Sequence, residues 1–255
     1  TGLHSALVRD FVRGDLGVIS QRSGDGLIVE FTPEGLMALN RGTVGGRTIV
    51  VTDVRRPLDE PGNVAAGPDA APLLPHLPAI ARLTAALTEA RGPCTLEWVV
   101  DRGEPYFVDY SVLGGSTVAV SATGGVQISP GTATGPLLRI EEDDLLGRLS
   151  IGPAVSIDRS ADVLGHEGLA VIIDRVRACP RKPVVHVSRP YAVLSVLIGS
   201  VAGFVFDQGS TLGHLAILLR EAGVPAVAAA SLTGQGEATI SGGTVIFTGT
   251  GLEGM

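Results

Sequence analysis

The segment from Gly203 to Val227 constrains the fold of this chain more than any other part. An apolar run, a glycine-rich turn, a helical stretch that opens with His214, a glycine stop and a second apolar run follow one another. Glycine commonly ends a helix because it adopts the left-handed backbone freely, and Pro225 marks the turn that follows. Short buried strands that alternate with helices are typical of α/β packing.

The rest of the second half repeats this pattern. Short apolar runs separated by helical patterns indicate further strands and helices. The expected strands are 137–140, 169–173, 184–187, 203–206, 226–229 and 244–247, and the expected helices are 191–200 and 214–222.

The first half has a different character, that of an antiparallel meander followed by a helix and a hairpin. The expected strands are 16–19, 27–31, 48–52, 95–100 and 105–110, with a helix over 77–90. Residues 57–78 are rich in proline and glycine and are expected to form an exposed connection without regular structure. The pair Gly114-Gly115 interrupts the apolar pattern, so we expect a first domain over 1–113, a linker over 114–128 and a second domain over 129–255.

Composition and charge exclude several classes of function. The 255 residues carry a formal net charge of -7, and their basic residues are scattered, which argues against nucleic-acid binding. Apolar runs are too short for a membrane helix, so a cytoplasmic protein is expected. Cys94 and Cys179 are expected to be reduced core residues. The chain begins at Thr1 without a methionine, which indicates processing, removal of a tag or a fragment of a longer protein.

The chemistry of the chain is expected at His214. Free N–H groups at the start of a helix, preceded by Gly209 and Gly213, form a site for an anion such as phosphate. The positive end of the helix favours the neutral imidazole, which can accept a phosphoryl group. The alternative from the residues alone is that His214 only caps the turn between strand and helix.

This segment resembles the phosphohistidine signature of phosphoenolpyruvate synthases, pyruvate phosphate dikinases and rifampicin phosphotransferases. The matching residues are Gly209, His214, Ala216, Ile217, Arg220, Glu221, Gly223, Pro225, Ala226 and Val227. Ser129–Gly135 also resembles the opening of that family's domain. The resemblance implies a β/β/α phosphohistidine swivelling domain, with His214 catalytic and Gly209, Gly213 and Arg220 in contact with the phosphoryl group or cofactor. Leu212 departs from the family, which has a hydroxyl residue nearby, so regulation through a threonine does not carry over.

The first half resembles, more weakly, the C-terminal portion of the family's ATP-grasp domain, an α+β fold. Residues 33–45 are similar to its Gly-Leu-Gly-Glu loop region, and 95–109 to its last pair of strands. The resemblance implies that ATP and Mg²⁺ are cofactors and that Glu97, with Asp109, binds the metal. The alternative for Glu97 is a strand residue that faces solvent. Ser111 stands where the family has an arginine, and the first ATP-grasp subdomain has no counterpart. The nucleotide-binding partner is therefore expected upstream or in a separate chain.

The resemblance implies a phosphotransferase component that carries a phosphoryl group on His214 between an ATP-grasp site and a second site. The acceptor or donor there would be phosphoenolpyruvate, pyruvate or a small hydroxylated molecule. Arg220 is expected to have a structural or docking role in which it meets acidic groups or phosphate on a partner domain. The alternative is an exposed residue that pairs with Glu221 or an acidic loop. The acidic run 141–144 is expected to be solvated. The alternatives are a degenerate homologue that serves as a scaffold or partner subunit, and a free-standing module for a small ligand.

Overall fold

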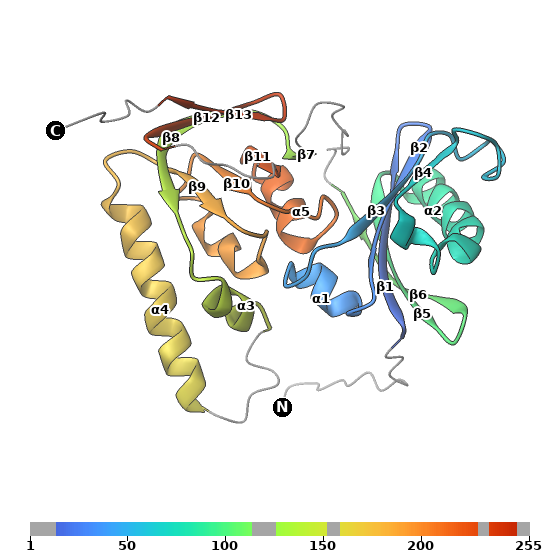
Figure 1. The fold of residues 1–255 in the computed structure, drawn as a ribbon, viewed down its shortest axis with the longest axis horizontal. Coiled ribbons are helices and arrows are strands. Elements are labelled where there is room, and N and C mark those ends of the chain that lie inside the picture. Colours follow the sequence, from blue (N-terminus) through green and yellow to red (C-terminus); the bar gives the residue numbers. More distant parts are fainter. Residues whose placement is uncertain (1–13, 114–125, 152–158, 229–234, 249–255) are drawn as a thin grey trace, which may run out of the picture.

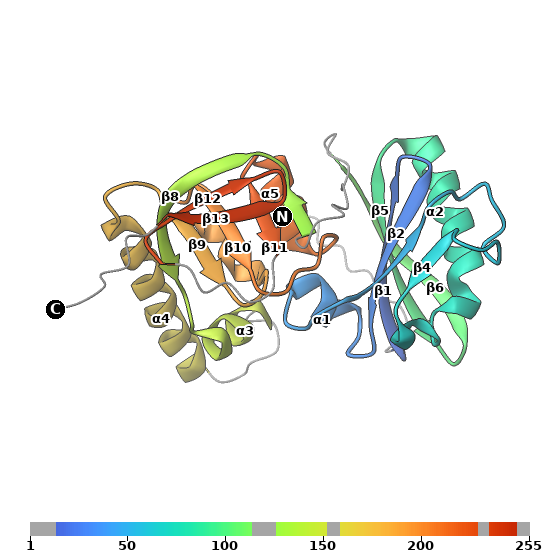
Figure 2. The ribbon, with the colours of Figure 1, turned by 45° about the horizontal axis from the view of Figure 1, so that its top comes forward.

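A computed structural model describes residues 14–113, 126–151, 159–228 and 235–248 of the chain. Two sheets form two units, which we call the N-terminal unit (14–113) and the C-terminal unit (126–248), and the units lie side by side (Figures 1 and 2). The mixed α/β character expected from the sequence is confirmed. The likeness of the first unit to an ATP-grasp portion and the domain boundaries stay predictions.

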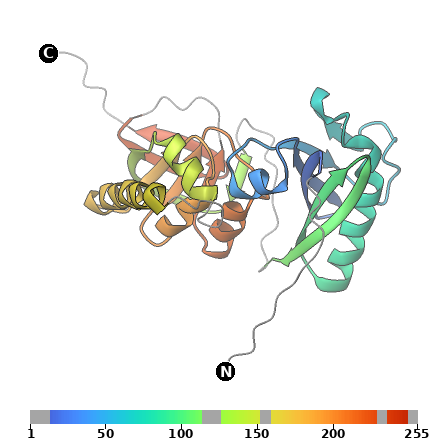
Figure 3. The same ribbon diagram turned by 90° about the horizontal axis from the view of Figure 1, so that it is seen from below.

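The N-terminal unit is an antiparallel sheet with the strand order β4-β3-β2-β1-β5-β6. Its elements, in chain order, are β1 (Leu16–Ser23), β2 (Gly26–Thr32), α1 (Leu36–Arg41), β3 (Arg47–Val51), β4 (Val64–Ala66), two short 3₁₀ helices (Pro68–Ala70 and Leu74–His76), α2 (Leu77–Arg91), β5 (Cys94–Asp101) and β6 (Glu104–Val112). Helix α2 covers the face turned away from the C-terminal unit, and α1 lies between the two units (Figures 1 and 3).

Alternation of side chains along each strand gives this sheet two faces with different tasks. In β2, Leu27, Val29 and Phe31 pack in the core beneath α2. Ile28 belongs to a smaller cluster on the opposite face, the face that α1 covers. Glu30 also points to that opposite face, because it lies two residues after Ile28 on the same strand.

The expectation that residues 57–78 hold no regular element is wrong. Strand β4 and two short helices lie there, and the fully buried Asn63 organises them. The Asn63 side chain accepts hydrogen bonds from the Asp53 amide at 3.0 Å and from the Thr52 hydroxyl at 2.8 Å. It donates to the carbonyls of Asp53 and Pro57, both at 3.0 Å. A single amide side chain thus supplies side-chain hydrogen bonds to a segment whose prolines lack a backbone N–H and whose glycines have no side chain.

The C-terminal unit is built on a sheet with the strand order β13-β12-β8-β9-β10-β11-β7, in which β8, β9, β10 and β11 are parallel. Its elements are β7 (Val126–Ser129), β8 (Thr132–Arg139), α3 (Asp143–Ile151), α4 (Arg159–Ala178), β9 (Val184–Val187), a 3₁₀ helix (Ala192–Leu197), β10 (Gly203–Phe206), α5 (His214–Glu221), β11 (Ala226–Ala228), β12 (Glu237–Ser241) and β13 (Thr244–Thr248).

The strands of this unit separate two hydrophobic layers. Phe204 and Phe206 of β10 pack with the helices, whereas Val205 between them packs with Ala133 of β8 and Ile240 of β12. Helices therefore cover one face of the parallel strands, while the curled β8–β12–β13 portion covers the other. This is the β/β/α layering that the resemblance implied.

The strand expected at 169–173 is wrong, because these residues lie inside α4. Ile172 and Val176 are buried four residues apart, whereas Val171 is 57% exposed. A spacing of four places both buried residues on one side of a helix. The short apolar run that resembled a strand is thus part of an amphipathic helix.

Candidate functional site

His214 is the first residue of α5 and is exposed to solvent. Gly213 is the N-cap residue, with an extended backbone, and the first helical turn contains no acidic side chain. Leu215, Ala216 and Leu219 fix the helix by packing into the core. The amides of the first turn have no acceptor within the helix, so they create a partial positive charge beside the imidazole. This geometry suits a histidine that receives an anionic group.

The loop before His214 is held close to the sheet. A side-chain carbon added at Gly209 would lie 2.6 Å from Ile128 and 2.7 Å from Ala228, so only glycine fits there without displacement. The Ser210 hydroxyl accepts a hydrogen bond of 2.8 Å from the Gly213 amide. The loop is therefore fixed both against its own sheet and across its own turn.

Leu212 extends from this loop into the N-terminal unit. It is fully buried and joins the cluster of Ile19, Ile28, Leu36, Leu39 and Val99 on the sheet face that α1 covers. The residue whose missing hydroxyl departs from the family pattern thus has a packing role. It anchors the loop of His214 in an apolar contact between the two units.

Glu30 of β2 makes the strongest polar contact between the units. Its carboxylate accepts hydrogen bonds from the Thr211 amide and the Thr211 hydroxyl, both at 2.6 Å, and from the Leu212 amide at 3.3 Å. The Ser210 hydroxyl donates to the same carboxylate. Glu30 is 1% exposed, so these four donors replace the water that an ionised carboxylate would otherwise bind.

Arg220 lies on the other side of the same loop and is only 6% exposed. Its Nη1 donates to the carbonyls of Thr211 at 2.7 Å and Ile128 at 3.0 Å, while Nη2 is buried without a hydrogen-bond partner among the described residues. Burial lowers the pKa of this guanidinium to about 10, an effect that the charge of Glu30 opposes. The expectation of an outward-facing arginine is therefore wrong: in this arrangement, Arg220 positions the loop.

The two predicted metal ligands lie on the sheet opposite His214. Glu97 of β5 and Asp109 of β6 are partners across adjacent strands, with Glu97 half-buried and Asp109 exposed. Burial raises the pKa of Glu97, as does the charge of Asp109, whereas a hydrogen bond from Asn40 and the charge of His214 lower it. The structure thus places both Asp109 and His214 within electrostatic range of Glu97.

The carboxylate pair can take part in metal binding only together with other ligands. The part of the chain that the structure describes contains no group of three or more His, Cys, Asp or Glu residues that could hold a metal ion. Magnesium commonly uses one or two carboxylates and completes its octahedron with phosphate oxygens and water. Glu97 and Asp109 therefore fit an ion that arrives with a phosphorylated substrate.

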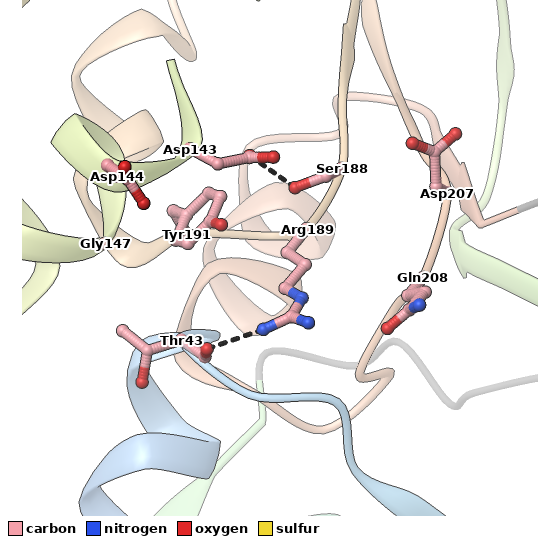
Figure 4. A pocket seen from close by; sticks show the side chains of 9 residues that line it. All are labelled: Thr43, Asp143, Asp144, Gly147, Ser188, Arg189, Tyr191, Asp207 and Gln208. Carbon is pink, nitrogen blue, oxygen red and sulfur yellow. Dashed lines mark hydrogen bonds between the residues drawn. The ribbon is translucent and has the colours of Figure 1, made fainter. Parts of the chain in front are cut away.

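A second polar region lies at the carboxyl ends of β9 and β10, where a pocket of about 440 Å³ opens between the units (Figure 4). Its lining residues are Thr43, Asp143, Asp144, Gly147, Ser188, Arg189, Tyr191, Asp207 and Gln208. Nη1 of Arg189 donates to the Thr43 carbonyl at 2.7 Å and so links the units beside the pocket. The Ser188 hydroxyl donates to Asp143, and burial raises the pKa of the neighbouring Tyr191. The expectation that the acidic run 141–144 is only solvated is therefore wrong for Asp143.

His186 differs from His214 in that both of its ring nitrogens are engaged. Nδ1 lies 2.6 Å from Nη1 of Arg139, and Nε2 lies 2.7 Å from the Asp207 carboxylate. Since an arginine only donates, Nδ1 must accept and Nε2 must carry the proton. His186 is a buried link between Arg139 and the rim of the pocket.

Sequence reasoning missed Glu30, Asn40 and Thr211. One signal was present, since Glu30 is a lone charge in the apolar run 27–31, and such a charge needs partners when the strand is buried. Which residues supply those partners depends on contacts between residues about 180 positions apart, which no local pattern encodes.

Comparison with known proteins bears on the C-terminal unit. Residues 184–246 match the family model described as the mobile domain of PEP-utilising enzymes. This segment extends from β9 into β13 and includes α5 with His214. No curated protein matches the chain significantly. No helix of the described residues has the length and apolarity that crossing a membrane requires.

Proposed function

We propose that this chain is a phosphotransferase component with His214 as its phosphoryl carrier, because residues 184–246 match the mobile-domain model of PEP-utilising enzymes. The observation that carries this proposal is the position of His214, exposed at the start of α5 and within electrostatic range of Glu97 on the other unit. A histidine needed only for packing would not lie exposed between a helix N-terminus and a pair of carboxylates.

In the proposed reaction, a lone pair on the imidazole of His214 attacks a phosphorus atom of the donor. The N–P bond forms while the P–O bond to the leaving group breaks, and the leaving oxygen keeps the electron pair. The acceptor oxygen later attacks the same phosphorus and releases the imidazole. A covalent carrier divides one transfer between distant sites into two local transfers.

The surrounding residues assist this chemistry by position and charge. The first-turn amides of α5 stabilise negative charge on the phosphoryl oxygens. Glu97 and Asp109 would hold magnesium, which neutralises phosphate charge when it is bound. The donor we propose is ATP or phosphoenolpyruvate, and a nucleotide-binding partner, upstream or separate, would complete the first site. The acceptor would be a small hydroxylated molecule or pyruvate.

The proposal is tested by labelling. We expect the chain, incubated with radiolabelled phosphoenolpyruvate or with labelled ATP and magnesium, to take up phosphate that is labile in acid and stable in base. His214→Ala should remove all of this label while changing the free energy of unfolding by only about 0.5 kcal/mol, because the side chain is exposed. His76→Ala, a change in the other unit, is the matched control and should be labelled like the wild type. Acid-labile phosphate on His214→Ala would contradict the assignment.

A scaffold or partner subunit is the competing function. It is favoured by Ser111, which lies on the exposed strand β6 and has no guanidinium with which to bind phosphate. A folded wild-type chain that takes no label from either donor would support this second function.

A further inference from the structure

The donors that surround the Glu30 carboxylate form an oxyanion site. Two backbone amides and two hydroxyls, all from residues 210–212, converge on the two oxygens of a single carboxylate. Consecutive amides and hydroxyls before a helix are also the donors that proteins use for phosphate. In this arrangement the anion is supplied by the other unit of the same chain.

A second observation supports an anion site. The guanidinium of Arg220 lies behind the loop, and its buried Nη2 has no hydrogen-bond partner among the described residues. A buried cation with an unused donor favours negative charge nearby, whichever group carries it. Glu30 provides that charge only while the two units are together.

We propose that Glu30 is a clamp that holds the unphosphorylated loop of His214 against the N-terminal unit, and that phosphorylation of His214 releases it. This inference rests on the proposed function. A phosphoryl group on His214 adds between one and two negative charges. They arise next to the charges of Glu97 and Asp109 and beside a loop already bound to Glu30. The phosphoryl group competes for the donors of residues 210–212, and the carboxylates repel it when no metal ion is bound to them.

The clamp gives a direction to the proposed movement of the C-terminal unit relative to the N-terminal unit. The unphosphorylated unit is held where Glu97 and Asp109 face His214, which is where it would receive a phosphoryl group. The phosphorylated unit is repelled from that place, toward a second site. Leu212, which remains apolar in both states, supplies the part of the contact that does not depend on charge.

The first test uses a chemical phosphoryl donor, so it needs no enzymatic activity. Phosphoramidate transfers its phosphoryl group to an imidazole nitrogen: the P–N bond of the reagent breaks, a new N–P bond forms on the histidine, and ammonia leaves. We expect small-angle scattering to show a larger radius of gyration for the phosphorylated chain. Hydrogen exchange at the amides of Thr211 and Leu212 should become at least about tenfold faster. His214→Ala, treated in the same way, should stay compact and protected.

The second test changes the clamp itself. Glu30→Gln removes the charge with almost no change in shape, and we expect the same expansion and faster exchange without any phosphoryl group. Glu34→Gln removes an exposed carboxylate of the same unit and is the matched control, which should behave like the wild type. Thr211→Val removes one donor from the other side and should weaken the contact if Glu30→Gln fails to fold.

The outcomes separate this inference from the proposed function. A phosphorylated chain as compact as the unmodified one, or a folded Glu30→Gln or Thr211→Val chain with wild-type exchange, would overturn the clamp. Failure to take label from phosphoenolpyruvate or ATP would overturn the phosphotransfer proposal and leave the result with phosphoramidate standing.

Discussion

Glu97 shows how a single side chain makes stability depend on pH. Burial is the largest cause of its raised pKa, so its neutral form is favoured in the folded state. The contribution of Glu97 to the free energy of unfolding is therefore fully present below its ordinary pKa of 4.5. This contribution is lost as the pH rises through the higher pKa that Glu97 has in the folded state. At neutral pH, the ionised carboxylate is a cost that a bound magnesium ion would remove.

We predict that Glu97→Gln melts at a higher temperature than the wild type at neutral pH, because the amide is never ionised. The difference in melting temperature should close as pH falls below about 4.5. Thermal scans between about pH 4 and about pH 8 measure it, with the exposed Glu104→Gln as the control for simple loss of charge. A difference that stays constant over this range would contradict the assigned cause.

For single residues, the sequence predicted His214 and the pair Glu97 and Asp109 as site residues, because each lies in a local motif, and their roles stay predictions. It misjudged Arg220, since a pattern of helix residues does not tell whether a charged side chain points outward or beneath a neighbouring loop. It missed the role of Glu30 because the partners of that carboxylate come from the other unit.

The elements of the N-terminal unit are tied together by a buried chain of hydrogen bonds. The indole N–H of Trp98 in β5 donates to the Ser20 hydroxyl of β1 at 2.9 Å. Ser20 in turn lies 2.8 Å from the hydroxyl of Thr84 in α2, which donates to the carbonyl of Ile80 at 2.7 Å. Because each of the two hydroxyls both accepts and donates, the indole N–H and both hydroxyls of this network have hydrogen-bond partners.

We predict that Ser20→Ala destabilises this unit by about 2 kcal/mol, because the Trp98 N–H is left buried without an acceptor. Urea denaturation followed by far-ultraviolet circular dichroism measures the loss, and this signal is present with or without Trp98. In a Trp98→Phe background the same change should cost less, since the orphaned donor is gone. Equal costs in both backgrounds would show that the indole bond is not the cause.

Strands and helices were predictable wherever the apolar period was unambiguous, as for α2 and β9. The wrong strand prediction at 169–173 came from an apolar run so short that it fits the two-residue period of a strand as well as the 3.6-residue period of a helix. The structure shows that the run lies within helix α4, which continues to Ala178. The error at 57–78 came from composition, because proline and glycine exclude long elements but not a short strand organised by Asn63.

The two units also meet at Gly42, which follows α1 with a φ of +68°. A side-chain carbon there would lie 2.2 Å from the carbonyl oxygen of Pro190 in the C-terminal unit. Glycine is thus required both by backbone conformation and by the close approach of the units. This contact is steric and independent of charge, unlike that of Glu30.

We predict that Gly42→Ala separates the units and enlarges the radius of gyration. Gly24→Ala is the matched control, because Gly24 has a φ of +59° and open space around it. Both variants should lose about 1 kcal/mol from the strained backbone, but only Gly42→Ala should expand. If the two variants scatter alike, the approach of Gly42 to Pro190 does not govern docking.

The two engaged nitrogens of His186 have a consequence for chemical selectivity. Nδ1 already uses its lone pair to accept from Arg139, and Nε2 carries the proton that it donates to Asp207. Neither nitrogen is a nucleophile without the loss of a buried hydrogen bond. A small electrophile that reaches the C-terminal unit should therefore modify His214 long before His186, even if no protein partner guides it. The fold itself then distinguishes the reactive imidazole from an inert one, before any substrate is recognised.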